Sequence, residues 1–329
     1  MLSDKNIKIE KISYKYHAIL LVLILLSNIN YSKCIIFAQD IETKPHLYQM
    51  NDTGKFANSS FGFKPKKNLH EPGVNIFKLS GFSVFSVGAG VFLHNFQRHA
   101  WWSGQRGQFH IQNDWKYAMS MDKLGHFFVG GLINNTMYPA FLWSGLSKKT
   151  SLWVSTLLSI GYMTDIEIED GFATQWGYSP GDEIFNIAGD AFAIARDLWE
   201  PLKTVKFKWS YWPTGDPLHK GDFPDDYNGQ TFWFSFNIHS YLPEKLQSIW
   251  PSYLNLAVGY GVKNYEDYGP GGRNQNLYLS LDYDFRKIIP GDSSFMLWVK
   301  EFISNFKIIP APALLWNTTA GKFKYVVHL

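Results

Sequence analysis

The feature that most constrains the fold of this chain is a change in hydrophobic period near Pro201. Before this proline, apolar residues form long runs with helical spacing, whereas the segment "VKFKWSYW" after it alternates apolar and polar side chains. A period near 3.6 residues is typical of helices, and a period of two is typical of half-buried strands. The sequence therefore predicts an α+β protein, with an N-terminal helical bundle and an antiparallel, aromatic-rich β-meander packed on it.

Four helical runs are expected before Pro201. They cover residues 76–93, 126–143, 151–170 and 179–199, the second being interrupted at "NNTMYP". Ser179 followed by Pro180 is a helix start signal for the last of them. Each of the last three runs is near or below the roughly 20 residues that a membrane-spanning helix needs, and each contains polar residues. A compact bundle is therefore favoured over a polytopic membrane protein.

The first run, "IFKLSGFSVFSVGAGVFL", is apolar almost all round. This pattern favours a buried helix, in which Gly81, Gly88 and Gly90 would be points of close packing. A membrane-inserted helix is the alternative.

Strands are expected after Pro201 because short alternating segments are separated by turn signals such as "DDYNGQ" and "EDYGPGGRNQ". The segments are "VKFKWSYW", "TFWFSFNI", "YLNLAVGYGV", "NLYLSLDYDF" and "KFKYVVHL". One helical stripe is expected over residues 295–306. About five strands are too few for a transmembrane barrel, so they predict a sheet packed on helices.

The N-terminal region resembles a secretion signal. Lysines precede the short apolar run "AILLVLILL", and Ala38 offers a cleavage point, so we expect export. The single cysteine, Cys34, follows Lys33, where a lipoprotein box requires a small residue, so no lipid anchor is predicted. The mature chain would then have no disulfide and no cysteine-bound metal.

Composition limits the partners. The formal net charge is +3 and the lysines are scattered, so we expect no nucleic-acid partner. Aromatic residues make up 17% of the chain, a content that suits a thick core or a membrane interface equally well.

The segment "SMDKLGHFFVGG" places charged residues at the start of an apolar run. On a helix, Asp122 and His126 are i and i+4 and project from one face. The carboxylate would then fix the tautomer of the imidazole and raise its basicity, or the two would share a cation. The alternative is that Asp122 caps the helix and His126 is a hydrogen-bonded core residue.

Two further polar clusters lie on later helical runs. Glu167 and Asp170 end an apolar helix, where acids meet the unfavourable end of the helix dipole unless a cation compensates them. That partner would be Lys123, Arg98, a protonated histidine or a metal. The next helix carries Asp182, Asn186 and Gly189 at i, i+4 and i+7. A mid-helix amide among large apolar residues needs a specific partner.

These clusters follow one another in a definite order, Asp122-Lys123-x-x-His126, Glu167-x-x-Asp170-Gly171, and Ser179-x-x-Asp182-x-x-x-Asn186-x-x-Gly189. The order resembles the YfiM-like family of predicted periplasmic lipoproteins, and more remotely the VanZ-like membrane proteins associated with glycopeptide resistance. The resemblance covers about residues 101–199, and the chain departs from it by lacking a lipoprotein box and by its strand-rich extension. It implies a shared polar site in a protein of the periplasm or outer membrane of a Gram-negative bacterium.

The chain is accordingly expected to divide into four parts. These are a signal peptide (1–38), a surface arm or linker (39–73), a helical domain resembling that family (74–200), and a strand-rich C-terminal region with one helix (201–329).

Three functions fit the sequence. The favoured one is a structural or binding protein of the cell envelope, held together by a buried network of Asp122, Lys123, His126, Glu167, Asp170, Asp182, Asn186 and Gly189. The alternative is a hydrolase of an envelope lipid or glycan, with His126, Asp122 and Glu167 as catalytic residues and a divalent metal as an optional cofactor of undefined identity. In the third, the aromatic sheet docks on a membrane, a lipid, a glycan or an outer-membrane protein.

Overall fold

The computed structural model describes residues 73–104, 106–214, 224–266 and 272–329. All of them belong to one compact unit, residues 58–329. The expected signal peptide, and all but the last residue of the expected arm, lie outside the described residues.

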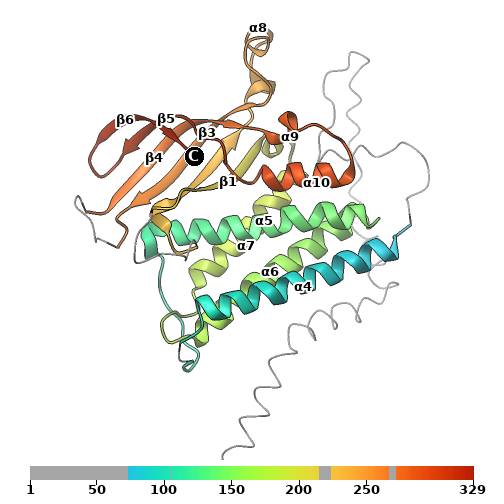
Figure 1. Ribbon diagram of the computed structural model, residues 1–329, viewed down its shortest axis with the longest axis vertical. Helices are drawn as coiled ribbons and strands as arrows, with labels where there is room; N and C mark the ends of the chain where they lie inside the picture. The colour runs from blue at the N-terminus through green and yellow to red at the C-terminus, as the bar shows by residue number, and fades with distance from the viewer. Residues whose placement is uncertain (1–72, 105, 215–223, 267–271) are drawn as a thin grey trace, which may run out of the picture. The chain divides into compact units, whose positions relative to one another are not determined.

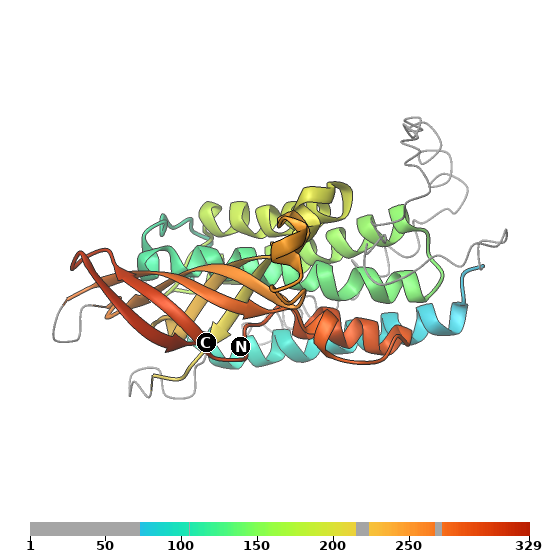
Figure 2. The ribbon, with the colours of Figure 1, turned by 90° about the horizontal axis from the view of Figure 1, so that it is seen from above.

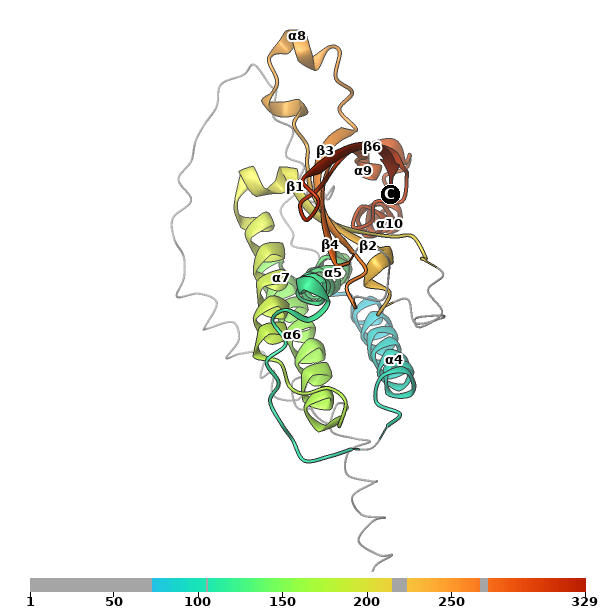
Figure 3. The same cartoon turned by 90° about the vertical axis from the view of Figure 1, so that its left-hand side faces the viewer.

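Four long helices form the N-terminal part of this unit (Figure 1). They are α4 (Ile76–Ala100), α5 (Met121–Trp143), α6 (Lys148–Phe172) and α7 (Pro180–Leu198). Helix α5 is central, because it contacts α6, α7 and the first strand of the sheet. Figure 3 shows α5 between the sheet and helix α6.

Six strands follow as an antiparallel meander. They are β1 (Val205–Tyr211), β2 (Gln230–Phe236), β3 (Leu254–Lys263), β4 (Asn274–Tyr283), β5 (Ala311–Asn317) and β6 (Lys322–His328). The strands are hydrogen-bonded in the order in which they occur in the sequence. Three short helices interrupt them, α8 (Glu244–Gln247), α9 (Phe285–Ile288) and α10 (Ser294–Ile303). Helix α10 lies alongside α5 (Figure 2). The predicted α+β fold, a bundle carrying an aromatic-rich meander, is confirmed.

Aromatic rings join the sheet to the bundle. The rings of Phe207 in β1 and Phe232 in β2 stack with centroids 5.8 Å apart. Phe127 of α5 packs edge-on against Phe207 at 4.7 Å, and Phe128 lies 6.1 Å from Phe232. Such contacts add to the free energy gained by burying the rings. They fix the N-terminal half of α5 against the sheet, and this half carries the polar motif.

The opposite face of β1 is polar and equally buried. Lys208 Nζ lies 2.6 Å from Asp282 Oδ2, and both side chains are 1% exposed. Lys206 is paired in the same way with Glu301 of α10, at 2.7 Å. The alternation expected in "VKFKWSYW" is therefore present, with lysines on a closed polar face and aromatic rings on the other.

One strand was missed. The expected five strands correspond to β1–β4 and β6, but β5 has no counterpart among them. Pro310 and Pro312 flank Ala311 at its start, and proline argues against a strand. The pairing of β5 with β4 covers only Ala313 to Asn317, so the missing N–H of Pro312 costs no bond in that ladder.

Two expectations for the helices are wrong. Helix α5 is not interrupted at "NNTMYP" but continues through Pro139. The missing N–H of Pro139 frees the carbonyl of Asn135, and the next carbonyl, that of Thr136, accepts a hydrogen bond from Trp298 Nε1 of α10 at 3.0 Å. Helix α4 is not buried, since none of its residues is in the core. A Cβ on Gly81, Gly88 or Gly90 would meet nothing within 4 Å, so these glycines are not points of close packing within the unit.

Candidate functional site

A strained turn sets the start of α5. Ala118, Met119 and Ser120 have positive φ angles of 45°, 57° and 67°, which non-glycine residues rarely adopt. The turn is held from the sheet, because the Tyr260 hydroxyl of β3 donates to the carbonyl of Met119 at 2.8 Å. Ser120 occupies the cap position without a side-chain cap, so the interpretation of Asp122 as the cap is wrong. Asp122 lies in the first turn, free to point toward other helices.

Lys123 is the centre of the charged cluster. Its side chain is 1% exposed, and its Nζ lies 2.8 Å from Asp114, 2.9 Å from Asp122 and 2.7 Å from Asp182. Burial would lower the pKa of this ammonium, but the three carboxylates outweigh it and raise the pKa above the ordinary range. Asp114 was not expected here. It also accepts a hydrogen bond from Ser179, the cap of α7, whose hydroxyl accepts in turn from the amide of Asp182.

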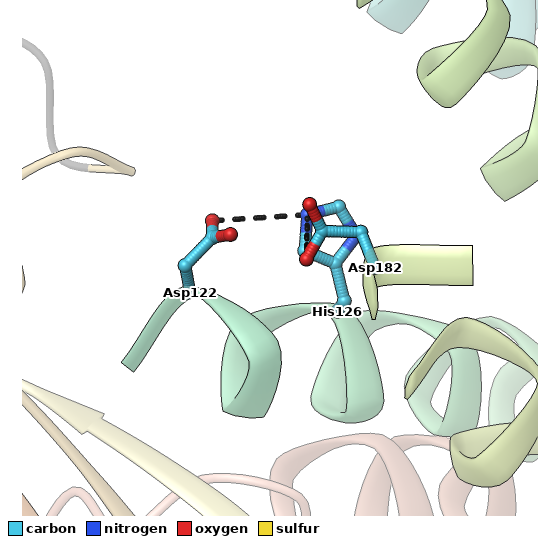
Figure 4. A group of neighbouring side chains, drawn as sticks. All are labelled: Asp122, His126 and Asp182. Carbon is cyan, nitrogen blue, oxygen red and sulfur yellow. Dashed lines mark ion pairs between the residues drawn. The ribbon is translucent and has the colours of Figure 1, made fainter. Parts of the chain in front are cut away.

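His126 faces two carboxylates. Its Nδ1 lies 3.0 Å from Asn186 Oδ1, an acceptor that places the proton on Nδ1. Its Nε2 then points between Asp122 Oδ1 at 3.7 Å and Asp182 Oδ1 at 3.6 Å (Figure 4). Burial lowers the pKa of His126, but the acids Asp122, Asp182 and Glu167 outweigh this effect and raise it to about 9.

The acids at the end of α6 have different partners. Glu167 is 1% exposed, with Oε1 3.4 Å from His126 Nδ1 and Oε2 accepting from the amide of Ser179. Burial raises the pKa of Glu167 to about 8, which His126 only partly offsets. Asp170 accepts from Trp102 Nε1 at 2.6 Å, and burial raises its pKa to about 7. A protonated histidine is therefore the cationic partner of Glu167, while an indole N–H satisfies Asp170.

Glycines allow α5 and α7 to approach closely enough to form the cluster. A Cβ on Gly189 would lie 2.1 Å from the carbonyl oxygen of Phe127, and one on Gly130 would lie 2.7 Å from that of Asn186. Larger residues would separate the helices and pull Asn186 away from His126. Gly189 thus contributes to the site by allowing close packing of the two helix backbones, and it supplies no functional group.

The polar network continues into the bundle through two residues that were not expected. Asn134 of α5 donates to Thr156 of α6 at 2.7 Å and to Asp190 of α7 at 3.2 Å. The sequence contained one signal for Asp190, because Asp182, Asn186 and Asp190 repeat at i, i+4 and i+8 on one helix face.

The three groups in Figure 4 can hold a metal ion. One ligand atom each from Asp122, His126 and Asp182 lie within 4.8 Å of one another. Ligands about 2.1 Å from one tetrahedral ion lie about 3.4 Å apart, close to the distances from Nε2 to the two oxygens. Asn186 orients the imidazole, and the Tyr227 hydroxyl donates to Asp122 Oδ1 at 2.7 Å. Such outer partners are typical of metal ligands.

The segment that carries the site is also the segment that matches a protein-family model. Residues 111–197 match the model of a family described as "Predicted periplasmic lipoprotein (DUF2279)". No curated protein and no solved structure matches the chain. The family description agrees with the expected export to the periplasm or outer membrane of a Gram-negative bacterium. Residues 111–197, which supply the site residues from Asp114 to Asp190, are therefore similar to this family of predicted periplasmic lipoproteins.

Proposed function

We propose that this exported protein is a binding protein of the cell envelope, whose buried polar network takes up a divalent cation between Asp122, His126 and Asp182. The observation that carries the proposal is the position of His126 Nε2. It lies 3.7 Å and 3.6 Å from two carboxylate oxygens, too far for hydrogen bonds and close enough to share an ion with them.

Charge supports the same conclusion. The cluster contains five acids, Asp114, Asp122, Glu167, Asp170 and Asp182, against two bases, Lys123 and His126. If all were ionised, three negative charges would be uncompensated in a nearly dry site. Without a cation, the acids can only retain protons, as the raised pKa values of Glu167 and Asp170 indicate. A divalent ion would neutralise most of this excess.

The donor set indicates the kind of ion. Two carboxylates and one imidazole suit a hard or borderline divalent ion such as Mg²⁺, Mn²⁺ or Zn²⁺. Lys123 stays beside the ion as a fixed positive charge, since it is held by three carboxylates and is 1% exposed. Its contacts with Asp114, Asp122 and Asp182 also link α5, α7 and the segment before α5, which is the structural part of the role.

The test is metal analysis of the purified full-length protein. After equilibration with Mn²⁺, Zn²⁺ or Mg²⁺ and desalting, we expect about one ion per chain for at least one of the metals. His126→Ala and Asp182→Asn should lose it. The matched control is Asp165→Asn on α6, whose carboxylate is 42% exposed and lies outside the cluster. Protein that retains no ion and shows no thermal shift with any of the three metals would overturn the proposal.

A metal-dependent hydrolase acting on an envelope lipid or glycan is the second candidate. It is favoured by the partial exposure of the ligands, since the side chains of His126 and Asp122 are 16% and 14% exposed while that of Glu167 is 1% exposed. Three protein ligands leave positions for water, and a bound ion lowers the pKa of that water. Glu167, with its pKa near 8, would hold the proton beside His126.

Turnover separates the two candidates. A hydrolase should cleave a lipid-linked phosphate when loaded with the metal, and His126→Ala should abolish cleavage, whereas Asp165→Asn should retain it. Metal-loaded protein without turnover of lipid phosphates or glycans would leave cation binding as the function.

A further inference from the structure

Helix α4 presents an apolar surface to its surroundings along its whole length. The helix has 25 residues, none of which is buried in the unit. Its outward side chains include Phe77, Val84, Phe85 and Phe92, which are 87%, 74%, 67% and 69% exposed. Contiguous apolar exposure on this scale is not typical of a surface that faces water. Something apolar must cover it.

The length of the apolar stretch fits a lipid bilayer. From Leu79 to Gln97 the helix has no aspartate, glutamate, lysine or arginine, and His94, near the end of this stretch, pairs with Asp165 of α6 at 3.0 Å. These residues extend about 28 Å at about 1.5 Å per residue, close to the roughly 30 Å of a hydrocarbon core. By length and composition, α4 is long and apolar enough to cross a membrane. It is neither a buried core helix nor close to the N-terminus.

Both ends of the stretch carry the residues that anchor helices at membrane interfaces. At one end, Lys78 Nζ lies 4.6 Å above the ring of Trp143, the last residue of α5. At the other end, Arg98 is followed closely by the half-buried Trp101, while the next residue, Trp102, is buried in the core. Tryptophan and basic residues are enriched where the hydrocarbon meets the head groups. The polar site lies at the second end, because Trp102 donates to Asp170.

The neighbouring helices have an inverted polarity. On α6, Trp153 and Leu157 are 53% and 55% exposed, whereas Ser155 and Ser159 are completely buried. On α7, Ile184 and Ile187 are 53% and 45% exposed. The inward face of α7 carries Asp182, Asn186 and Asp190, which are nearly buried. Small polar residues between helices and large apolar residues outside are typical of helices surrounded by lipid.

We propose that α4 spans a lipid bilayer and that the exposed apolar faces of α6 and α7 contact its acyl chains. A second copy of the chain is the competing occupant. Lipid is favoured because the apolar surface extends over three helices and ends at cationic and tryptophan residues, as a bilayer requires. The inference is independent of the cation site, so either can fail without the other.

Cysteine labelling of the full chain in opened membrane fragments tests the proposal. Phe85→Cys and Phe92→Cys are introduced on a Cys34→Ser background, with Lys245→Cys in the exposed α8 as the control. Maleimide reacts with the thiolate. Placing a charge at the bilayer centre costs about 2.5 kcal/mol, which corresponds to roughly 60-fold slower labelling at the two α4 positions than at the control. Labelling should be complete for all three variants after denaturation.

Two outcomes would overturn the proposal. Labelling of Phe85→Cys and Phe92→Cys at the rate of Lys245→Cys would show that water surrounds the helix. Efficient disulfide cross-linking of Phe85→Cys between two chains on mild oxidation would assign this face to a second copy. Both α4 side chains are more than two-thirds exposed, so the substitutions remove no core packing and the variants should fold.

Discussion

Replacing Lys123 by methionine is the sharpest test of the charged cluster. The substitution keeps an unbranched side chain of similar length and removes only the ammonium. Three carboxylates, from Asp114, Asp122 and Asp182, would then lie close together without the cation that lies 2.7 to 2.9 Å from them. The contact is almost dry, since Lys123 is 1% exposed.

The expected loss follows from the cost of leaving a buried charge unpaired. Removing one partner of a buried ion pair destabilises a protein by about 3–5 kcal/mol. For a unit of this size each kcal/mol lowers the melting temperature by about 2–4 °C, so we expect a decrease of about 6–20 °C. Because the carboxylates raise the pKa of Lys123, its charge persists from pH 5 to 9, and the pH dependence of its contribution comes from the acids. The loss should be smaller at pH 5, where Asp182, whose pKa burial raises, is protonated.

Thermal unfolding of the purified full-length protein, followed by circular dichroism, measures the effect. The control is Lys203→Met, which removes an exposed i, i+3 pair with Glu200 and should change stability by less than about 1 kcal/mol. If Lys123→Met melts within 2 °C of this control at pH 7, as an order-of-magnitude threshold from the same scaling, the cluster does not hold the helices together.

Three further outcomes are expected. Gly189→Ala should destabilise the protein by about 1–3 kcal/mol, because the new Cβ would lie 2.1 Å from the Phe127 carbonyl oxygen. The control Gly88→Ala, whose Cβ would meet nothing within 4 Å, should leave the stability unchanged. Equal melting temperatures of the two variants would refute the close approach of α5 and α7. Without metal, the melting temperature should fall steadily from pH 5 to 9, because folding raises the pKa values of His126 and Glu167. For His126 the stability is present below the unfolded pKa near 6.5 and is lost as pH rises through about 9. For Glu167 it is present below the unfolded pKa near 4.5 and is lost as pH rises through about 8. For His126 the change amounts to about 3 kcal/mol, and a melting temperature that rises over this range would contradict the assignment. Metal binding at pH 7 should release protons, so the calorimetric heat should depend on the ionisation enthalpy of the buffer; a buffer-independent heat would mean that His126 and the acids are already deprotonated.

Local patterns were sufficient for much of the fold. The change of period near Pro201 predicted helices followed by strands, because side-chain spacing is a property of the local backbone. Ser179 and Pro180 predicted the start of α7, and the Ser179 hydroxyl does accept from the amide of Asp182. The same spacing placed Asp122 and His126 on one face of α5, and their side chains do face each other.

Other features could be seen only in the tertiary structure, since they depend on residues far apart in the chain. Asp114 and Asp190 join the network through contacts with other elements. The exposure of α4 depends on how many neighbouring elements cover it. A helix that is apolar all round can be covered by protein or by lipid, and its sequence pattern does not distinguish the two.

The sequence by itself determined which side chains lie on each helix face, because that follows from 3.6 residues per turn. Only the tertiary structure decided that three such faces meet. The meeting requires α5 and α7 to approach through Gly130 and Gly189 and requires a left-handed turn at Ser120 to aim the start of α5. Both are outcomes of packing between distant segments, for which no local spacing provides a signal.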